Sequence, residues 1–187
     1  TGTESGLTIR NKIFDLQGDT SKIPIPNHVH ASLVPINIER LQHIGPGQGR
    51  NALPDHLRLP TQRRHVNNGH SETYGRLMWD EPAPTLTTSF HSISKGRFAH
   101  PTETRGLTLR EGARLQGFPD DFEFMGKVSQ IARQIGNAVS PPVSEALGTR
   151  IRRFMDIAIL SERNSLITCE TEIKLGTAEF EVIEVLY

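Results

Sequence analysis

Arginines, histidines and a single cysteine are the residues of this sequence that could carry chemistry. Cys169 is the only cysteine, which excludes an internal disulfide and a multi-cysteine zinc site within these 187 residues. Among the eight histidines, His65 and His70 lie five residues apart, and no converging set of zinc ligands follows. We therefore expect surface histidines and no metal site. Cys169, within SLITCETE, is expected to be a small strand residue rather than a nucleophile.

Two short stretches are suited to bind phosphate through arginine. The turn GPGQGR at 45–50 offers backbone N–H groups and Arg50, but it lacks the Lys-Ser/Thr ending of a nucleotide-triphosphate loop. We therefore expect a plain surface loop rather than an ATP or GTP site. TQRRHV at 61–66 places Arg63 and Arg64 side by side, where they would contact the phosphates of a nucleic acid.

The charge is unevenly spread along the chain. The formal net charge is zero, which argues against a general polyanion binder. Residues 39–114 nevertheless hold 11 Lys and Arg against 7 Asp and Glu, whereas residues 151–187 hold 4 against 7. A basic middle and an acidic tail suit a DNA-facing surface on a neutral body, although ordinary patchiness would give the same counts.

The stretch LTLREGARLQGFPDDF at 107–122 predicts a short, well-bounded helix. Thr108 followed three residues later by Glu111 is the pattern of a capping box. Gly117 is suited to the left-handed residue that ends a helix, and Pro119 prevents the helix from resuming. We expect Leu109 and Ala113 to face inward. The arginines Arg110 and Arg114 are expected to face outward.

Other elements are read from the apolar pattern. Short apolar runs broken by Pro and Gly predict strands and loops over residues 1–60, with one short helix over 37–43. TLTTSF at 85–90 alternates as a strand does, and a second helix is expected over 128–135. A third helix is the clearest, because its apolar residues recur at three- and four-residue steps. Its stripe consists of Val143, Leu147, Ile151, Phe154, Met155 and Ala158.

The length and the ends of the chain limit the classes of protein to which it can belong. A chain of 187 residues suffices for one ordinary domain or a compact domain with an appendage. No apolar run is long enough to span a bilayer and no signal peptide opens the sequence, so we expect a cytoplasmic protein with no membrane partner. The first residue is Thr1 rather than Met, which leads us to expect a piece of something longer.

Two motifs give the sequence a family resemblance. The stretch GRFAHPTETRGLTLREGARLQGFPDDFEF at 96–124, followed by QIGNAVSPPV at 134–143, resembles the ninth and tenth conserved motifs of DNA cytosine-5 methyltransferases. Two motifs in the family's order make chance similarity improbable. Earlier segments are similar to the target-recognition domain of one bacterial branch. They are the Asn-His pair at 27–28, ERLQHIGPGQGR at 39–50 and YGRLMWDEPAPTLTT at 74–88. The resemblance covers roughly residues 25–150 and implies the C-terminal part of such an enzyme.

The resemblance implies roles for particular residues. Double-stranded DNA would be the partner, and S-adenosyl-L-methionine would be the cofactor, shared with a catalytic half. The ninth motif would organise the recognition scaffold through Thr108, Arg110, Glu111, Arg114 and Gln116. The tenth motif would contact the methyl donor through Gly136, Asn137, Ala138 and Val139. The DNA contacts would come from Arg50, Arg63, Arg64, Arg76 and Arg97.

Several family features are missing from the printed residues. The Pro-Cys-Gln and Glu-Asn-Val segments, which carry the nucleophile and the general acid, do not occur, nor does the glycine-rich donor loop. We therefore expect no catalytic residue here and no methyl transfer by this chain alone. It would be a fragment or one subunit of a split enzyme. A non-catalytic, sequence-specific DNA-binding module is the alternative, and an RNA-directed relative is less favoured.

The expected fold class is α+β. A small mixed recognition domain of short strands and loops would span residues 1–127, with the ninth motif at its end. Closing helices over 128–160 would pack on an absent α/β methyltransferase domain, and a strand-rich extension would cover 161–187. Without the catalytic domain, the apolar stripe of the third helix would be exposed or would pair with a second copy.

Overall fold

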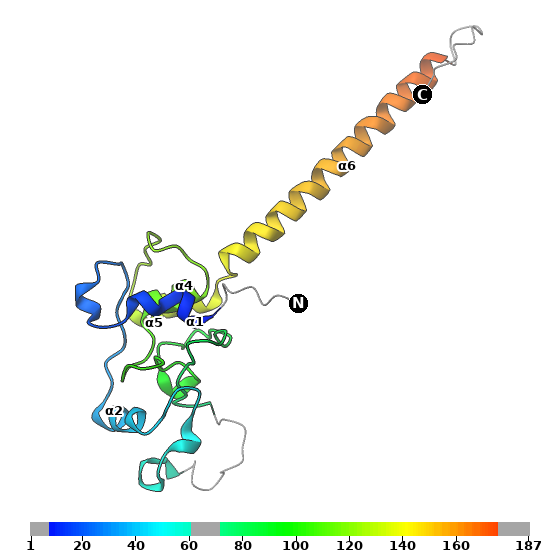
Figure 1. Ribbon diagram of the computed structural model, residues 1–187. Helices are drawn as coiled ribbons and strands as arrows, with labels where there is room; N and C mark the ends of the chain where they lie inside the picture. The colour runs from blue at the N-terminus through cyan, green and yellow to red at the C-terminus, as the bar shows by residue number, and fades with distance from the viewer. Residues whose placement is uncertain (1–7, 61–71, 176–187) are drawn as a thin grey trace. The chain divides into compact units, whose positions relative to one another are not determined.

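The computed structural model describes residues 8–60 and 72–175 (Figure 1). Contacts within the chain divide it into two compact units, Thr1–Pro141 and Pro142–Tyr187. Arg63 and Arg64 lie outside the described residues. The boundaries predicted at residues 127 and 160 stay predictions.

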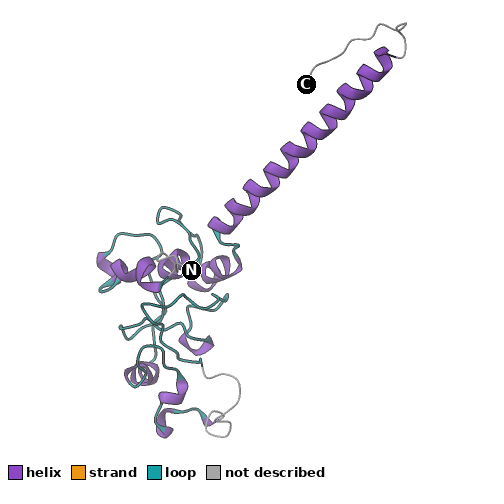
Figure 2. Cartoon of the chain, turned by 45° about the vertical axis from the view of Figure 1, so that its right-hand side comes forward, coloured by secondary structure: helices purple, strands orange, loops and turns teal. Residues whose placement is uncertain are grey.

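The first unit is built from short helices joined by loops (Figure 2). Its α-helices are α1 (Ile9–Ile13), α2 (Pro35–Gln42), α4 (Leu109–Leu115) and α5 (Val128–Asn137). Single 3-10 turns lie between them: η1 (Phe14–Leu16), η2 (Thr20–Lys22), η3 (Arg50–Ala52), η4 (Asp55–Leu57) and η5 (Ile93–Lys95). The short helices expected over 37–43, after Thr108 and over 128–135 are thereby confirmed.

The predicted α+β class is wrong for the described residues, because no strand forms in 8–60 or 72–175. Extended segments meet only at isolated bridges, among them Pro46 with Arg76, and Arg76 with Ala99. The strand expected at 85–90 is instead an irregular segment ending in a turn, where the Phe90 N–H donates to the Thr87 carbonyl at 3.1 Å. Prolines and closely spaced turns interrupt each extended run before a ladder can grow.

Two apolar clusters form the core of the first unit. One gathers side chains from α1, α4, α5 and the loops beside them, including Ile13, Phe90, Leu109 and Ile135. In this cluster α4 packs against both α1 and α5. The other cluster lies entirely within residues 33–99 and comprises Leu33, Leu41, Ile44, Leu53, Leu57, Tyr74, Ile93 and Ala99.

The second unit contains the long helix α6 (Pro141–Leu175). The helix begins where the paired prolines predict, but it continues well past the expected end near residue 160. Residues 161–175, expected to be strand, are therefore helical, and Cys169 lies within the helix. The remaining extension, 176–187, lies outside the described residues. Searching the described helices for a stretch apolar and long enough to cross a bilayer finds no candidate.

The apolar stripe predicted for this helix is exposed in α6. Val143, Leu147 and Ile151 have 51%, 55% and 59% of their surface exposed, and Phe154 has 64%. A row of this size is more than scattered surface residues, which indicates that the stripe is made to be covered by another surface.

A glycine of α4 provides a test of the first core cluster. A Cβ atom added at Gly112 would overlap two ring carbons of the fully buried Phe90. We expect Gly112→Ala to lower the free energy of unfolding by about 1–3 kcal/mol, despite the better helix propensity of alanine. Urea denaturation followed by circular dichroism measures the change. The matched control is Gly148→Ala in α6, where an added Cβ meets no atom within 4 Å and should not destabilise the chain.

Candidate functional site

Helix α4 begins with the predicted capping box. The Glu111 N–H donates to the Thr108 hydroxyl at 3.0 Å, and the Thr108 N–H donates to the Glu111 carboxylate at 2.8 Å. Both residues are fully buried, so the cap lies inside the protein rather than at its surface. It fixes the direction of α4 and also buries a carboxylate that needs a cation nearby.

Arg105 supplies that cation. Its two terminal nitrogens donate to the Glu111 carboxylate at 2.8 and 2.7 Å, and its Nε donates to Glu103 at 2.7 Å. The paired, planar geometry is the strongest form of an arginine–carboxylate interaction. Burial opposes the charge on Arg105, but the bonds to Glu111 and Glu103 outweigh it and raise the pKa of the guanidinium.

Two buried histidines complete this cluster. His100 accepts the Glu103 N–H at its Nδ1 atom (3.0 Å), and its Nε2 lies 3.9 Å from carboxylate oxygens of both Glu103 and Glu111. Burial lowers the pKa of His100 to about 4, so the ring is neutral at pH 7. His28 lies 3.1 Å from the Thr108 hydroxyl, and burial lowers its pKa as well.

Arg110 does not face outward as predicted. Its side chain is fully buried and donates to the carbonyls of Pro26 (2.8 Å), Pro119 (2.8 Å) and Phe122 (2.7 Å). The expectation failed because helix periodicity cannot show that loops from both sides of the sequence fold over this face. The three bonds satisfy carbonyls that have no sheet partner.

Arg114 is half-buried and also holds loops. Two of its nitrogens donate to the Asp120 carboxylate at 2.8 and 2.6 Å, and the third binds Asp15 (2.6 Å) and the Lys12 carbonyl (3.1 Å). Hydrogen bonding to Arg114 lowers the pKa of Asp120. Arg114 thus joins α4 to the end of α1 and to the loop that follows α4.

Gln116 connects α4 to the end of α5. Its amide nitrogen donates to the carbonyls of Ile135 at 3.1 Å and Ala138 at 3.5 Å. All five residues predicted as the recognition scaffold therefore contact chain segments outside α4 or close its cap. Their contacts reach residues 12–15, 26–28, 105, 119–122 and 135–138.

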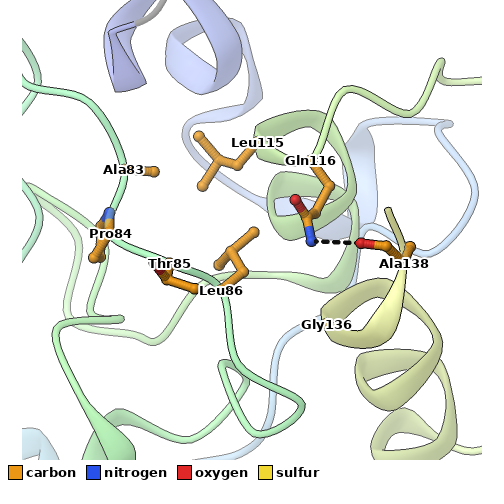
Figure 3. A pocket seen from close by; sticks show the side chains of 8 residues that line it. All are labelled: Ala83, Pro84, Thr85, Leu86, Leu115, Gln116, Gly136 and Ala138. Carbon is orange, nitrogen blue, oxygen red and sulfur yellow. Dashed lines mark hydrogen bonds between the residues drawn. The ribbon is translucent and has the colours of Figure 1, made fainter. Parts of the chain in front are cut away.

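A cavity of about 420 Å³ opens beside the contact between Gln116 and the end of α5 (Figure 3). Two of the four residues predicted to contact a cofactor, Gly136 and Ala138, line it, together with Ala83, Pro84, Thr85, Leu86, Leu115 and Gln116. A Cβ atom at Gly136 would lie 2.6 Å from the backbone of Thr87 and Thr88, so only glycine allows α5 to end this close to that segment. Asn137 and Val139 are exposed.

The three predicted DNA contacts that the structure describes, Arg50, Arg76 and Arg97, lie in different surroundings. Arg50 is half-exposed in η3, at the end of the turn 45–50, and Arg97 forms an ion pair with Glu72. Arg76 is buried, and its guanidinium donates to the carbonyls of Leu41, Ile44, His100 and Glu103. A side chain engaged in this way is not available to phosphate, so we assign Arg76 to the scaffold.

The backbone of Arg76 also fixes the turn 45–50. Its carbonyl accepts from Gly47 at 3.2 Å, and its N–H donates to the Gln48 carbonyl at 3.0 Å. One residue therefore anchors the turn through its main chain and two further segments through its side chain. No group of three or more His, Cys, Asp or Glu residues in the described part of the chain is placed to hold a metal ion.

The sequence analysis missed three residues of the scaffold. The expectation of surface histidines is wrong for His100, which is fully buried, and neither His100 nor Arg105 has a local motif that predicts a buried partner. Asn27 has a positive φ of 64°, and its side-chain amide bonds the Phe124 backbone twice, at 2.8 and 3.0 Å. For Asn27, the signal that the sequence did offer is the Pro-Asn pair at 26–27. Asparagine tolerates the left-handed conformation, and its side chain readily hydrogen-bonds to the nearby backbone.

Comparison with known proteins gives one consistent family. Residues 8–153 match the model of the C-5 cytosine-specific DNA methylases. The chain is 35% identical over 133 residues to type II methylase M.HgiDII of Herpetosiphon aurantiacus, covering 69% of this chain and 38% of the relative. It is 45% identical over 94 residues to type II methyltransferase M.PspPI of a Psychrobacter strain, covering 50% of this chain and 22% of the relative.

A mammalian protein matches as well. DNA (cytosine-5)-methyltransferase 1 of Mus musculus is 42% identical over 98 residues, or 50% of this chain and 6% of the relative. The chain thus spans well under half the length of each of these three relatives.

The lowered pKa of His100 predicts how stability depends on pH. An unfolded histidine takes up a proton near pH 6.5, whereas His100 in the folded chain does so only near pH 4. Its contribution is therefore complete above pH 6.5 and is lost as the pH falls toward 4, by about 3 kcal/mol in total. In His100→Gln, the slope of unfolding free energy against pH between 6.5 and 5 should decrease by about 1 kcal/mol per pH unit.

Urea titrations at half-unit pH intervals measure that slope. The control is Ser129→Ala, because Ser129 is exposed and does not titrate, so its replacement should leave the slope unchanged. Equal slopes for His100→Gln and the unaltered chain would show that the ring is not kept neutral by burial.

Proposed function

Since the chain belongs to the C-5 cytosine-specific DNA methylase family, we propose that it forms the DNA-recognition and closing part of a DNA cytosine-5 methyltransferase. The observation that carries the proposal is the organisation of α4. The side chains of this seven-residue helix and its cap bind loops that are distant in sequence and so fix their positions. A recognition surface needs this kind of support, because side chains that read bases must be held in place by a rigid scaffold.

The chemistry of the reaction explains the division of labour. Methylation at cytosine C5 uses a thiolate that attacks C6 of a base swung out of the duplex. S-adenosylmethionine supplies the methyl group. The printed sequence has Cys169 alone, without a preceding proline, so we place the nucleophile on residues outside it. This chain would hold the duplex, read its sequence and keep the extruded geometry.

The end of α5 is the part that we propose lies against the methyl donor. Gly136 and Ala138 line the cavity of Figure 3, and Asn137 and Val139 are exposed beside it. These residues fit a donor contact because they offer backbone groups and a carboxamide at an open surface. In this arrangement Gln116, which also lines the cavity, is a positioning residue, because its amide nitrogen binds the carbonyls of Ile135 and Ala138.

DNA contacts would come from the surface that the scaffold supports. The turn 45–50 with Arg50 is bound by the backbone of Arg76, and the side chain of Arg97 passes beside Gly75, the residue before Arg76. Arg63 and Arg64 remain proposed phosphate contacts. Binding through such residues should weaken steeply with added salt, whereas base contacts should keep a preference among sequences.

A chimaera tests the proposal directly. Residues 8–153 of this chain replace the matching segment of M.HgiDII, and the product is assayed for transfer of labelled methyl groups to duplex DNA. We expect methylation at cytosine C5, lost when the M.HgiDII segment is deleted without replacement. Sequence-specific binding by this chain with no methylation in the chimaera would instead identify a non-catalytic DNA-binding module.

Asn137 provides a test of the donor site. In the active chimaera, we expect Asn137→Ala to raise the dissociation constant of S-adenosylmethionine about 10-fold, as loss of one or two hydrogen bonds would. DNA affinity should not change. Isothermal titration calorimetry measures the first and fluorescence anisotropy the second. The control is Ser129→Ala, an exposed position on the same helix, and an unaltered donor constant in Asn137→Ala would rule out the contact.

A further inference from the structure

The exposed side chain of Met78 lies against the turn 45–50. We propose that Met78 and Gln48 together read one thymine in the major groove of duplex DNA. Met78 contacts the 5-methyl group of the base, and Gln48 donates a hydrogen bond to its O4 atom. This inference rests on the proposed function, because it takes duplex DNA as the partner, and it adds the base and the two residues that select it.

Met78 packs directly on the backbone of the turn. Gly47 has a positive φ of 73°, and a Cβ atom added to it would lie 2.5 Å from the Met78 sulfur and 3.0 Å from its Cγ atom. Glycine, which has no Cβ atom, is what lets the methionine lie this close. Met78 nevertheless keeps 36% of its surface exposed. Its thioether therefore presents a polarisable, apolar surface beside the turn, which suits contact with a methyl group.

The backbone beneath Met78 is held in place by neighbouring segments. The Gly47 N–H donates to the Arg76 carbonyl at 3.2 Å, and the Arg76 N–H donates to the Gln48 carbonyl at 3.0 Å. The Arg50 N–H donates to the Thr73 carbonyl at 2.9 Å. The turn and the segment that carries the methionine are thus fixed to each other, as side chains that read bases require.

The side chain of Gln48 is exposed and oriented by its own turn. Its Oε1 atom accepts the Gly45 N–H at 3.0 Å, which fixes the carboxamide. Among the described residues its amide nitrogen has no protein acceptor, so this nitrogen is the group that can donate to a ligand. Gln48 thus offers a positioned donor next to the residue on which Met78 packs.

Thymine has the two features that this pair of side chains can bind. In the major groove it presents a 5-methyl group and the O4 acceptor on the same base. Cytosine presents an amino donor in place of O4 and has no methyl group, so it satisfies neither side chain. Adenine and guanine offer acceptors but lack the methyl group. The pair therefore favours thymine over the other three bases.

The charges around the pair allow DNA to approach. Residues 40–54 contain two arginines and one histidine but no Asp or Glu, and residues 73–79 also contain no acidic residue. The acidic residues that flank the second segment, Glu72 and Asp80, are each paired with an arginine. Phosphates on either side of a groove would therefore meet little repulsion at the turn.

Replacement of thymine by deoxyuridine tests the methyl contact. Duplexes that the full chain retains from a random pool are sequenced, and each thymine of the selected site is replaced in turn. We expect one replacement to weaken binding about 4-fold in fluorescence anisotropy, as loss of one buried methyl group would. In Met78→Ala the same replacement should have no effect. The matched control is Met125→Ala, a more exposed methionine in the loop after α4, which should keep the 4-fold loss.

Gln48→Glu tests the hydrogen bond to O4. The substitution replaces the donor nitrogen by an acceptor oxygen and keeps an oxygen for the Gly45 N–H. At the position of that thymine we expect the preference to move toward cytosine, whose N4 amino group donates to carboxylates. A merely structural role of Gln48 would weaken binding to all sequences alike and leave the preference unchanged.

The outcomes separate this inference from the proposed function. Binding without sequence preference, a site in which no thymine methyl group matters, or an equal uridine effect in Met78→Ala and the unaltered chain would overturn the methyl contact. An unchanged preference in Gln48→Glu would overturn the contact with O4. Methylation by the chimaera decides the proposed function by itself, so that function can stand while the reading of thymine fails.

Discussion

The buried carboxylate of Glu111 is the constraint on which the first unit depends. An ionised carboxylate inside a protein costs several kcal/mol unless cations and hydrogen bonds surround it, and removing one partner of such a pair typically costs 3–5 kcal/mol. Here two nitrogens of Arg105 and the Thr108 N–H surround it. Arg105 also binds Glu103, which accepts the Gly18 N–H at 2.8 Å. Compensating one charge therefore fixes the chain at residues 18, 103–105 and 108–111.

Buried arginines take over a task that a sheet usually performs. Because no ladder forms among the described residues, many loop carbonyls need other donors. Arg76 binds four of them and Arg110 binds three. The guanidinium group suits this task because its donors point in several fixed directions in one plane. Rigidity in this unit thus comes from side chains acting as branch points between loops.

The sequence predicted the parts of the structure that depend on neighbouring residues. The capping box of Thr108 and Glu111, the left-handed Gly117 with φ 88° and the start of α6 all follow from short patterns. The burial of Arg110 could not be predicted, because its three acceptors lie between 9 and 84 residues away. The strand predicted at 85–90 does not form for a related reason. Alternating residues indicate a preference for extended backbone, but no partner strand is available among the described residues. The family motifs pointed to five residues whose role as a recognition scaffold stays a prediction, while the pairing of Arg105 with Glu111 required the fold.

The way in which the two apolar clusters share the chain has a consequence for how such proteins change over time. Residues 33–57 contribute side chains to the second cluster alone, whereas residues 74–99 contribute to both. Leu77, Leu86, Phe90 and Phe98 from that later stretch are buried members of the first cluster. Recombination that exchanges residues 33–57 therefore leaves the packing around α1, α4 and α5 in place, whereas an exchange that extends to residue 99 replaces four of its buried side chains.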